Sequence, residues 1–543
     1  MGLFDTILVR KPKRTTFDLT HDVKLTCDFG KLVPFLCEEV VPGDTWYNKS
    51  DVLVRFSPLI APVMHRMWVT THFFYVPFRL LWNKYEDWET GGADGLQQPP
   101  FPQIMMHGSS TDTAGQWSRG SLADYLNYPT SDSNVVDLQT GGTPVSVLPF
   151  RAYQMIYNEY YRDENQQEEF EFKKGSDLLS SGSEYDEMLK LRNRAWRKDY
   201  FTSALPWPQK GKQQSVPIFG TGKVTDSEIG IKNLSKPSRV VDNSGSGTSD
   251  MYVDSSGYVK ARSNPSAFQS ALLDNSDNLT IENSQISFAD AGITIQELRR
   301  SARIQKLYEA KARGGSRLKE FLLSVFGVDN DDLRLFRPQF LGGGSTPVNI
   351  TDVVQTSQTT NDSPQGQYAG LGYSFGSSNS FKNTFKERGY VLGIMSIMPE
   401  CGYTEGLPRG YMKTDPLDFA LPQLADLGEQ EIYNYEVAMR KPEDGVKLTD
   451  TWGYAPRYAE YKYIPNRVHG EFKNMNSYGY WTLNRYYENF PTLSEEFIQC
   501  DAKANDLNRI FAVEDDATPK MLCQIVNHTK ARRPMPYLPI PTL

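Results

Sequence analysis

The stretch MHRMWVTTHFFYV (64–76) decides the fold class of this chain. From position 68 onward its residues alternate between two faces, and both faces are largely apolar: Val69, Thr71, Phe73 and Tyr75 on one, and Trp68, Thr70, His72 and Phe74 on the other. A period of two indicates a β-strand, and apolar residues on both faces predict a strand that is covered on each side. Pro77 ends the run.

Further strands are predicted on both sides of this stretch. Residues 35–41 and 52–56 are separated by Pro42-Gly43-Asp44, a turn in which Pro fixes φ and Gly accepts positive φ. Far along the chain, residues 388–399 again read as a strand bounded by Gly and Pro. The simplest interpretation is one β-rich body with a few helices and long loops.

Two segments have helical periodicity instead. Aromatic residues recur at spacings of three and four between positions 150 and 161, which places an aromatic stripe along one helix face: Phe150, Tyr153, Tyr157, Tyr160 and Tyr161. A second helix is expected from Thr294, because Thr294 and Glu297 form a capping-box pattern, and Gly314-Gly315 interrupts it. We therefore expect helices inserted between strands.

Composition excludes several classes of protein. The 543 residues have a mean hydropathy of −0.52, and no stretch approaches the roughly 20 apolar residues that span a bilayer. The net charge is −8, from 58 basic and 66 acidic residues, which argues against a protein that coats nucleic acid with most of its surface but leaves room for one basic face. The five cysteines are far apart and unpaired in spacing, so we expect free thiols in a reducing cytoplasm.

No motif for catalysis or metal binding is complete. The six histidines contain no H-E-x-x-H pair, G-x-S-x-G does not occur, and residues 220–223 lack the glycine spacing of a phosphate-binding loop. We therefore expect no catalytic residue, no metal ligand, no cofactor and no enzyme activity.

Two basic clusters are candidates for contact with phosphates. The first lies near the N-terminus, at Lys11, Lys13 and Arg14, and the second lies in the helical block, at Arg299, Arg300 and Arg303. Phosphate contact needs only point charges on a fixed surface. A solvated helix face explains the second cluster equally well, and spacing does not separate the two interpretations.

Two segments differ from the rest in composition. Residues 212–292 contain no Trp or Cys and are rich in Ser, Gly and Asn, so we expect a surface excursion from the main fold. Residues 341–381 are similarly polar, with Gly-rich ends. The C-terminal sequence RRPMPYLPIPTL (532–543) contains four prolines and predicts an extended arm lying on a neighbouring subunit, with a frayed tail as the alternative.

Read as whole segments, the chain resembles the major capsid protein of the microviruses, small icosahedral single-stranded DNA bacteriophages, and within them the gokushovirus branch. The segments that carry the resemblance keep their order over almost the full length: VVPGDTW (40–46), RFSPLIAPVMHRM (55–67), FFYVPFRLLW (73–82), LPFRAYQMIYNEYYRDENQ (148–166), DYFTSALPWPQKG (199–211), ELRRSARIQKLYEAKARGGSRLKEFLLSVFGV (297–328), DLRLFRPQFLGG (332–343), ERGYVLGIMSIMPE (387–400) and WGYAPRYAEYKYIPNRVHGEF (452–472).

The resemblance implies a mainly β fold, an eight-stranded antiparallel jelly roll of the viral capsid type with long inter-strand insertions containing several helices. It implies a single capsid domain over residues 1–543, of which sixty copies form a T=1 icosahedral shell around a circular single-stranded DNA genome. In this branch a large variable insertion forms protrusions at the threefold axes, and residues 212–292 fall where that insertion would lie. Host attachment through the protrusion is compatible with this role.

The resemblance also implies partners and a location. The partners are further copies of the chain, the DNA genome, a small basic DNA-packaging protein, scaffolding and pilot proteins and a bacterial surface receptor, with no membrane insertion. The location is the virion, assembled in the bacterial cytoplasm. For the aromatic helix, we expect Tyr153, Tyr157 and Tyr160 to be divided between the core and subunit contacts.

A carbohydrate-binding or glycoside-cleaving β-sandwich is the alternative function. A jelly roll rich in Tyr and Trp is compatible with sugar stacking, and carboxylates are plentiful, for example Glu495-Glu496. A glycosidase needs two carboxylates facing each other about 5 to 10 Å apart, which sequence alone does not reveal.

Overall fold

The computed structural model forms two compact units. The first, which we call the body, comprises Met1–Gly211 and Leu307–Leu543, and the second unit comprises Lys212–Lys306. The structure describes residues 13–108, 115–130, 142–211, 238–241, 248–253, 259–261, 295–314, 317, 320, 322–327, 336–356, 366–440, 446–513, 515 and 518–538.

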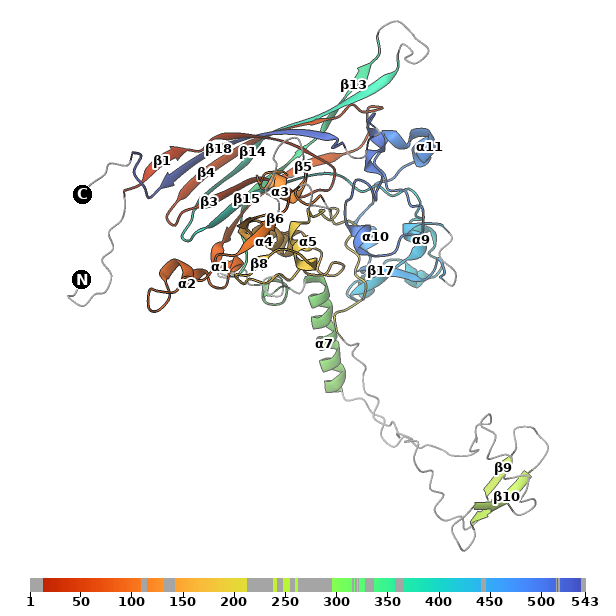
Figure 1. Cartoon of the computed structure of the whole chain (residues 1–543). Coiled ribbons are helices and arrows are strands. Elements are labelled where there is room, and N and C mark those ends of the chain that lie inside the picture. The colour runs from red at the N-terminus through yellow and green to blue at the C-terminus, as the bar shows by residue number, and fades with distance from the viewer. Residues whose placement is uncertain are drawn as a thin grey trace. The chain divides into compact units, whose positions relative to one another are not determined.

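One layer of the body is an antiparallel six-stranded sheet (Figure 1). Strand β18 pairs along one edge with β1 and then β2, and along its other edge with β4. The strands of this sheet are β1 (Thr15–Asp18), β2 (His21–Cys27), β18 (Met521–Arg533), β4 (Thr45–Phe56), β14 (Tyr368–Thr384) and β13 (Asn349–Val354).

The second layer is a four-stranded antiparallel sheet with the order β12-β5-β15-β3. Its strands are β12 (Gln339–Pro347), β5 (Met67–Pro77), β15 (Gly389–Pro399) and β3 (Val33–Val40). The chain passes from one sheet to the other at almost every step, with β2, β4, β14 and β18 in one and β3, β5, β12 and β15 in the other. This two-sheet arrangement is a jelly roll, so the predicted fold class is confirmed.

The main core lies between the two sheets. Alternate residues of each strand point inward, and the largest of them are aromatic; Phe73 of β5 packs edge-on against Phe35 at 5.6 Å and lies 5.1 Å from Phe381 of the opposite sheet, measured between ring centroids. Trp46 of β4 is fully buried in the same cluster. Burial of these rings is the main contribution to the stability of the sandwich.

The four-stranded sheet is covered on its other face as well. There Phe74 of β5 packs beside helix α4 (Leu148–Ile156), which is buried along its whole length, and beside Tyr160 at 4.8 Å. The predicted strand with two covered faces is therefore confirmed for β5, which ends at Pro77 as expected. The predicted aromatic stripe is also helical, as α4 followed by the π-helical segment η1 (Tyr157–Tyr161).

The remaining elements of the body are short and lie in the connections between the main strands. Small sheets are formed by β6 (Gln103–Met106), β7 (Thr143–Ser146) and β8 (Leu178–Leu179), and by β16 (Glu429–Tyr433) and β17 (Thr451–Pro456). The α-helices are α1 (Phe78–Leu81), α2 (Tyr85–Thr90), α3 (Leu122–Tyr125), α5 (Ser183–Leu189), α9 (Asn434–Val437), α10 (Ala459–Lys462), α11 (Met475–Tyr478) and α12 (Glu495–Ile498). The other helical turns are η2 (Leu322–Phe326), η4 (Arg409–Tyr411), η5 (Pro416–Asp418), η6 (Pro422–Leu424), η7 (Gly470–Lys473), η8 (Gly479–Trp481) and η9 (Leu507–Ile510).

The second unit contains a three-stranded antiparallel sheet of β9 (Ser238–Val241), β10 (Thr248–Val253) and β11 (Val259–Ala261). It also contains the first part of helix α7 (Ile295–Gly314), which ends where the Gly pair was expected to interrupt it. The expected cap Thr294 lies outside the described residues. The segment 212–292 falls within this unit, and its role as a protrusion stays a prediction.

Two polar segments have structures that their composition does not suggest. Residues 341–381 supply most of β12, β13 and β14, which belong to both sheets of the jelly roll. At the C-terminus, Arg532 and Arg533 still belong to β18, and the ring of Tyr537 stacks on that of Phe17 in the same chain at 5.9 Å. The rest of the expected arm, 539–543, lies outside the described residues.

Two expectations about class can be compared with the structure. All five cysteines are free thiols, as predicted. Among the described helices, none combines the length and the apolar character needed to cross a lipid bilayer.

Candidate assembly and nucleic-acid surface

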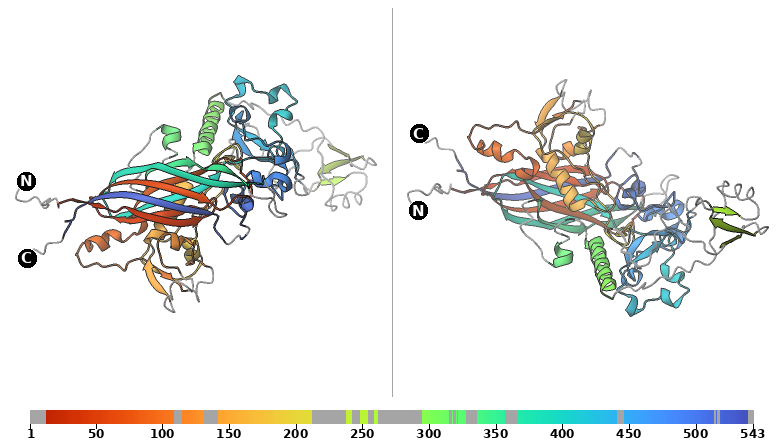
Figure 2. Two further views of the ribbon diagram at one scale, coloured as in Figure 1. Left: turned by 90° about the horizontal axis from the view of Figure 1, so that it is seen from above. Right: turned by 90° about the horizontal axis from the view of Figure 1, so that it is seen from below.

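The outward-facing side of the six-stranded sheet, which we call the outer face, is open. Seen from above, no helix among the described residues of the body lies over it (Figure 2, left). In the other sheet, β5 contacts α1 and β15 contacts α4. Strand residues alternate between the core and this face, so each strand presents every second side chain to the outside. The outer face is therefore a regular, uncovered surface on which the body can meet a partner.

One end of the outer face carries five basic side chains. We call them the cationic zone: Lys49, Lys382, His528, Lys530 and Arg532, all exposed. The strand register brings them together, since His528 lies opposite Lys49 on the neighbouring strand, and Lys530 lies two residues further along β18. Such a cluster supplies the point charges that a phosphate backbone requires.

Tyr47 lies inside this zone, between two lysines. It is opposite Lys530 on β18 and opposite Lys382 on β14, and its side chain is 53% exposed. An exposed aromatic ring flanked by cations is the arrangement on which single-stranded nucleic acids bind, with bases on the ring and phosphates on the charges.

Three carboxylates share the outer face and partly offset the cations. Asp51 lies 3.9 Å from Lys49 and 3.2 Å from His528, and Asp22 lies 2.8 Å from Lys24. Hydrogen bonds donated by Thr20 lower the pKa of Asp18, and a hydrogen bond from Lys24 lowers the pKa of Asp22. Because Asp18 and Asp22 stay ionised near neutral pH and Asp51 lies beside Lys49, the cationic zone is moderately rather than strongly positive.

The N-terminal basic cluster adjoins the cationic zone. Lys13 and Arg14 are exposed and directly precede β1, whose Thr15 pairs with Arg533 at the same end of β18. Lys11 lies outside the described residues. The second predicted cluster, Arg299, Arg300 and Arg303, is exposed on the part of α7 that belongs to the second unit.

Sequence reasoning missed most of the cationic zone. Three of its members could have been found, because His528, Lys530 and Arg532 recur with period two and so lie on one face at the end of a strand. Lys49 and Lys382 carried none, since each is a single lysine in a polar segment far from the others in sequence. Only the pairing of β4 with β14 and β18 places them side by side.

The other end of the outer face is apolar. We call it the apolar zone, and its members are large side chains that are 40 to 60% exposed: Val353, Leu371, Tyr373, Phe375 and Leu522. Tyr373 and Leu522 lie on the two sides of Arg55 of β4, an exposed cation that the apolar side chains flank. An exposed, largely apolar patch of this kind marks an interaction site.

The three tyrosines predicted to divide between core and interface are placed mainly in the core. Tyr153 is 0% exposed and donates a hydrogen bond to the carbonyl oxygen of Leu32, and Tyr157 is also buried. Tyr160 is half-buried and donates to the carbonyl oxygen of Pro338. An interface role therefore has to be withdrawn for Tyr153 and Tyr157, whose rings the chain covers itself, and it stays a prediction for Tyr160.

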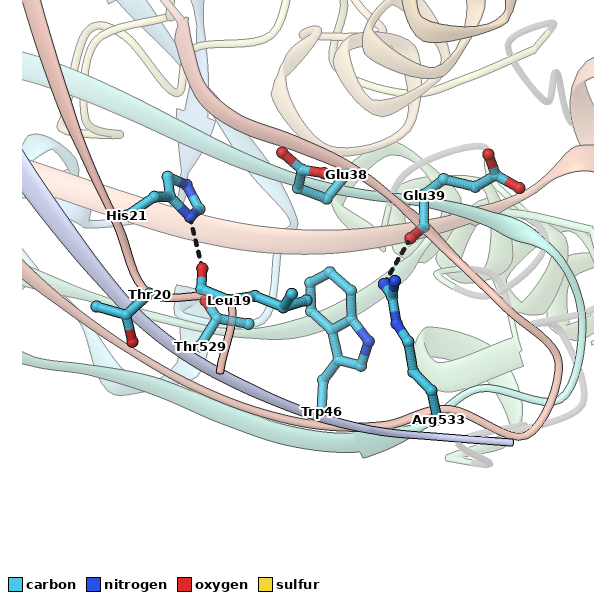
Figure 3. Close-up of a pocket in the computed structure, with 8 residues that line it drawn as sticks. All are labelled: Leu19, Thr20, His21, Glu38, Glu39, Trp46, Thr529 and Arg533. Carbon is cyan, nitrogen blue, oxygen red and sulfur yellow. Dashed lines mark hydrogen bonds between the residues drawn. The ribbon is translucent and has the colours of Figure 1, made fainter. Parts of the chain in front are cut away.

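A cavity of about 450 Å³ opens between the two sheets near the cationic zone (Figure 3). It is lined by Leu19, Thr20, His21, Glu38, Glu39, Trp46, Thr529 and Arg533. Glu38 and Glu39 are consecutive in β3 and their carboxylates point in different directions, so they do not form the facing pair of a glycosidase (Figure 3).

The other polar groups of this cavity are already engaged within the chain. The ring of His21 is hydrogen-bonded at both nitrogens, to Leu19 and to Asn527, and Arg533 forms an ion pair with the buried Asp44 at 3.1 Å. Among the described residues no group of His, Cys, Asp and Glu side chains is arranged to hold a metal ion. These contacts fit a structural role at the edge of the sandwich.

Comparison with known proteins relates the whole chain to capsid proteins. The family model described as "Capsid protein (F protein)" matches residues 7–543. The capsid protein VP1 of Chlamydia phage 1 is 32% identical, over 98% of this chain and 96% of that protein. The VP1 proteins of Bdellovibrio phage phiMH2K and Spiroplasma virus 4 are 32% and 29% identical, over 90% and 98% of this chain and 88% and 95% of those proteins.

Proposed function

The chain belongs to the phage capsid protein (F protein) family, and from this premise we propose that sixty copies of it form a T=1 icosahedral shell that encloses a circular single-stranded DNA genome. Capsid proteins assemble with copies of themselves, and the jelly roll of the body is the fold expected of such a subunit. Closed symmetry lets each modest contact recur around an axis without producing an open fibre.

The observation that carries this proposal is the division of the outer face. A uniform surface would fit a single partner, whereas this one has a cationic zone around Tyr47 at one end and an apolar zone around Phe375 at the other. A capsid subunit has two kinds of partner, the genome and its neighbours. We assign the cationic zone to the DNA and place it on the inside of the shell.

The net charge limits how much of the genome the shell neutralises. At −8 per copy, the chain has no excess of cations to balance the phosphates, and the cationic zone is a small local exception. A small basic packaging protein inside the particle would supply the missing charge. The zone then positions the DNA strand against the shell, and the packaging protein carries most of the neutralisation.

The second unit is our candidate for the surface protrusion. It is compact by itself and carries its own three-stranded sheet, which is the form expected of an insertion that varies without disturbing the jelly roll. We assign residues 212–292 to protrusions at the threefold axes that contribute to host attachment. Exchange of this segment between relatives should change host range while particle yield stays the same.

Electron microscopy of particles made by the full-length chain in a bacterial host tests the central claim. The expected result is spherical shells of uniform size that protect single-stranded DNA from nuclease. On denaturation these shells should dissociate and release this polypeptide. A chain that purifies only as monomers or small oligomers under the same conditions would contradict it. Scaffolding and pilot proteins would have to be co-expressed, because we expect assembly in the host cytoplasm to need them.

A further inference from the structure

We propose that the ribbon formed by β13 and the start of β14 is a subunit-contact element that docks, through the apolar zone, on a second copy of this chain. The inference rests on the proposed shell and names one of its contacts. It is carried by the shape of the ribbon, its attachment, its exposure and its charge.

The ribbon extends beyond the rest of its sheet (Figure 1). Its two strands are paired from Asn349 opposite Tyr373 to Val354 opposite Tyr368, and hydrogen bonds between Gln355 and its partners Gln367 and Gly366 continue the ladder. Among the described residues, Tyr368 and Ala369 of β14 pair with β13 alone, because β14 meets Leu59 at Gly370 and its pairing with β4 begins at Tyr373. The ribbon is therefore a two-stranded projection.

The root of the ribbon is fixed to the body by glycines. Gly370 exchanges backbone hydrogen bonds with Leu59, and a Cβ atom added at Gly370 would lie 2.6 Å from the carbonyl oxygen of Ala61. At Gly372 an added Cβ would lie 2.8 Å from the ring of Phe56. Close backbone approach at these positions sets the direction in which the ribbon leaves the body.

Beyond this root both faces of the ribbon expose apolar side chains. Val353 lies on the outer face, 48% exposed, and continues the apolar zone. On the opposite side Val354 and Tyr368 lie directly across from each other and are 44% and 52% exposed. An isolated two-stranded ribbon is at best marginally stable in water, so a projection with this much exposed apolar surface is stabilised when a partner covers it.

The charge of the segment selects a protein partner. Residues 338–381 contain no Lys or Arg, in a chain that has 58 of them, and only two acids, Asp352 and Asp362. The ribbon therefore has no cation of its own with which to neutralise phosphates or an anionic lipid surface, and Arg55 is the cation that its root flanks. Depletion of charge together with Tyr and Phe is instead the composition of the buried core of a protein–protein interface.

The partner is a second copy of the chain, because capsid proteins assemble with copies of themselves. Subunits of a closed shell meet through heterologous contacts, in which a projection of one copy lies on a different surface of the next. The ribbon is such a projection, and repetition around a symmetry axis covers every ribbon in the shell. Each ribbon contact then fixes the position of one subunit relative to the next.

The first test compares, in the presence of the scaffolding and pilot proteins, the assembly of two variants of the full-length chain. Tyr373→Ser with Phe375→Ser removes apolar surface from the apolar zone, and Tyr373→Phe with Phe375→Leu keeps it. We expect the serine variant to raise the protein concentration needed for shell formation at least tenfold and the conservative variant to change it less than twofold. Equal thresholds for the serine variant and the unaltered chain would overturn the inference. Thermal unfolding of the unassembled chains shows that both variants fold.

The second test needs no shell. A photo-cross-linking amino acid is placed at position 353, within the apolar zone, and the purified chain is irradiated over a range of concentrations. A covalent dimer on a denaturing gel supports the inference, because a cross-link within one chain keeps the monomer mass. Cross-links only within the chain, or only to nucleic acid and sensitive to nuclease, would overturn it. If the covalent dimer forms but no shells are found, the proposed shell is contradicted and the ribbon contact is not.

Discussion

The hydroxyl group of Tyr161 and Nδ1 of His72 lie 2.8 Å apart and share a hydrogen bond that ties η1 to the outward-facing side of β5. The two rings also stack at 5.8 Å, and Phe74 and Phe340 contact the imidazole from its edges. This contact joins the helical layer to the jelly roll, and it places a titratable group in an apolar environment.

The stability of the body should depend on pH through His72. Burial, helped by the nearby cation Arg194, lowers the pKa of His72 to about 4 from 6.5. Between these two values the unfolded chain binds a proton that the folded chain does not, so stability falls as the pH is lowered from about 6.5 to about 4. The contribution of this residue amounts to about 3 kcal/mol at most.

Replacement of the imidazole by a neutral group isolates this contribution. His72→Gln keeps a hydrogen-bonding side chain near Tyr161 but does not titrate, so its free energy of unfolding should fall less than that of the unaltered chain between pH 7 and pH 4.5. Thermal unfolding at several pH values measures the difference. Parallel pH curves for the two proteins would contradict the assignment of the effect to His72.

The hydroxyl group of Tyr153 should contribute to stability rather than to assembly. It donates to the carbonyl oxygen of Leu32 at 2.9 Å and accepts from the backbone N–H of Arg192 at 3.1 Å. Tyr153→Phe leaves both backbone groups buried without this partner, and we expect a loss of about 2 kcal/mol in the free energy of unfolding. Urea unfolding measures it, and Tyr411→Phe, at a side chain that is 74% exposed, should change stability by less than about 0.5 kcal/mol.

Glycine is required where β12 lies against β5. A Cβ atom added at Gly343 would lie 2.3 Å from the carbonyl oxygen of Thr71, so Gly343→Ala forces the two strands apart. We expect a loss of about 1–3 kcal/mol, as for other overpacked sites. Gly410→Ala is the matched control, because an added Cβ there meets nothing within 4 Å. Equal melting temperatures for the two variants would show that the sheet accommodates the methyl group.

How much of this fold can be read from the sequence depends on the strand. β5 and β15 were predictable, since both are apolar, bounded by turn residues and covered on two sides. β12 was not, because its Gly342-Gly343-Gly344 reads as a loop. In the structure the close approach of Thr71 explains Gly343, and Gly342 lies at a β-bulge with a φ of +153°. The end of β18, Arg532 and Arg533, was assigned to an arm because the four prolines that follow it favour an extended chain.

The candidate surface was less predictable than the fold. A cluster such as Lys13 and Arg14 is visible in sequence because its members are adjacent. The cationic zone instead combines Lys49, Lys382 and Lys530, which lie far apart in the sequence and meet only through strand register. For the aromatic helix the sequence predicted a division between core and interface, where the structure has mainly core. An aromatic stripe such as that of Tyr153 and Tyr157 fits a core or an interface equally well, and the sequence does not show which of the two covers it.

The cationic zone should set the salt dependence of DNA binding. In a single-stranded DNA, each phosphate that is neutralised contributes about 0.7 to the slope of log K against log salt concentration. A triple variant, Lys382→Gln, Lys530→Gln and Arg532→Gln, should therefore reduce the slope by about 2. The same change in charge at exposed residues elsewhere, Arg467→Gln, Lys473→Gln and Lys503→Gln, should leave the slope unchanged. An equal reduction in both variants would show that only net charge matters.

Tyr47 should act on the same DNA in a different way. Its ring lies between Lys382 and Lys530, so a base that stacks on it has phosphates within reach of both lysines. Stacking on an aromatic side chain contributes about 1–3 kcal/mol per base, and it involves no release of counterions. Tyr47→Ala should therefore weaken binding of a short single-stranded oligonucleotide about fivefold to a hundredfold without changing the salt slope. Tyr47→Phe should bind like the unaltered chain, because the ring is kept. A change in the slope for Tyr47→Ala, or an equal loss for Tyr47→Phe, would show that the ring is not a stacking platform and that the lysines alone hold the strand.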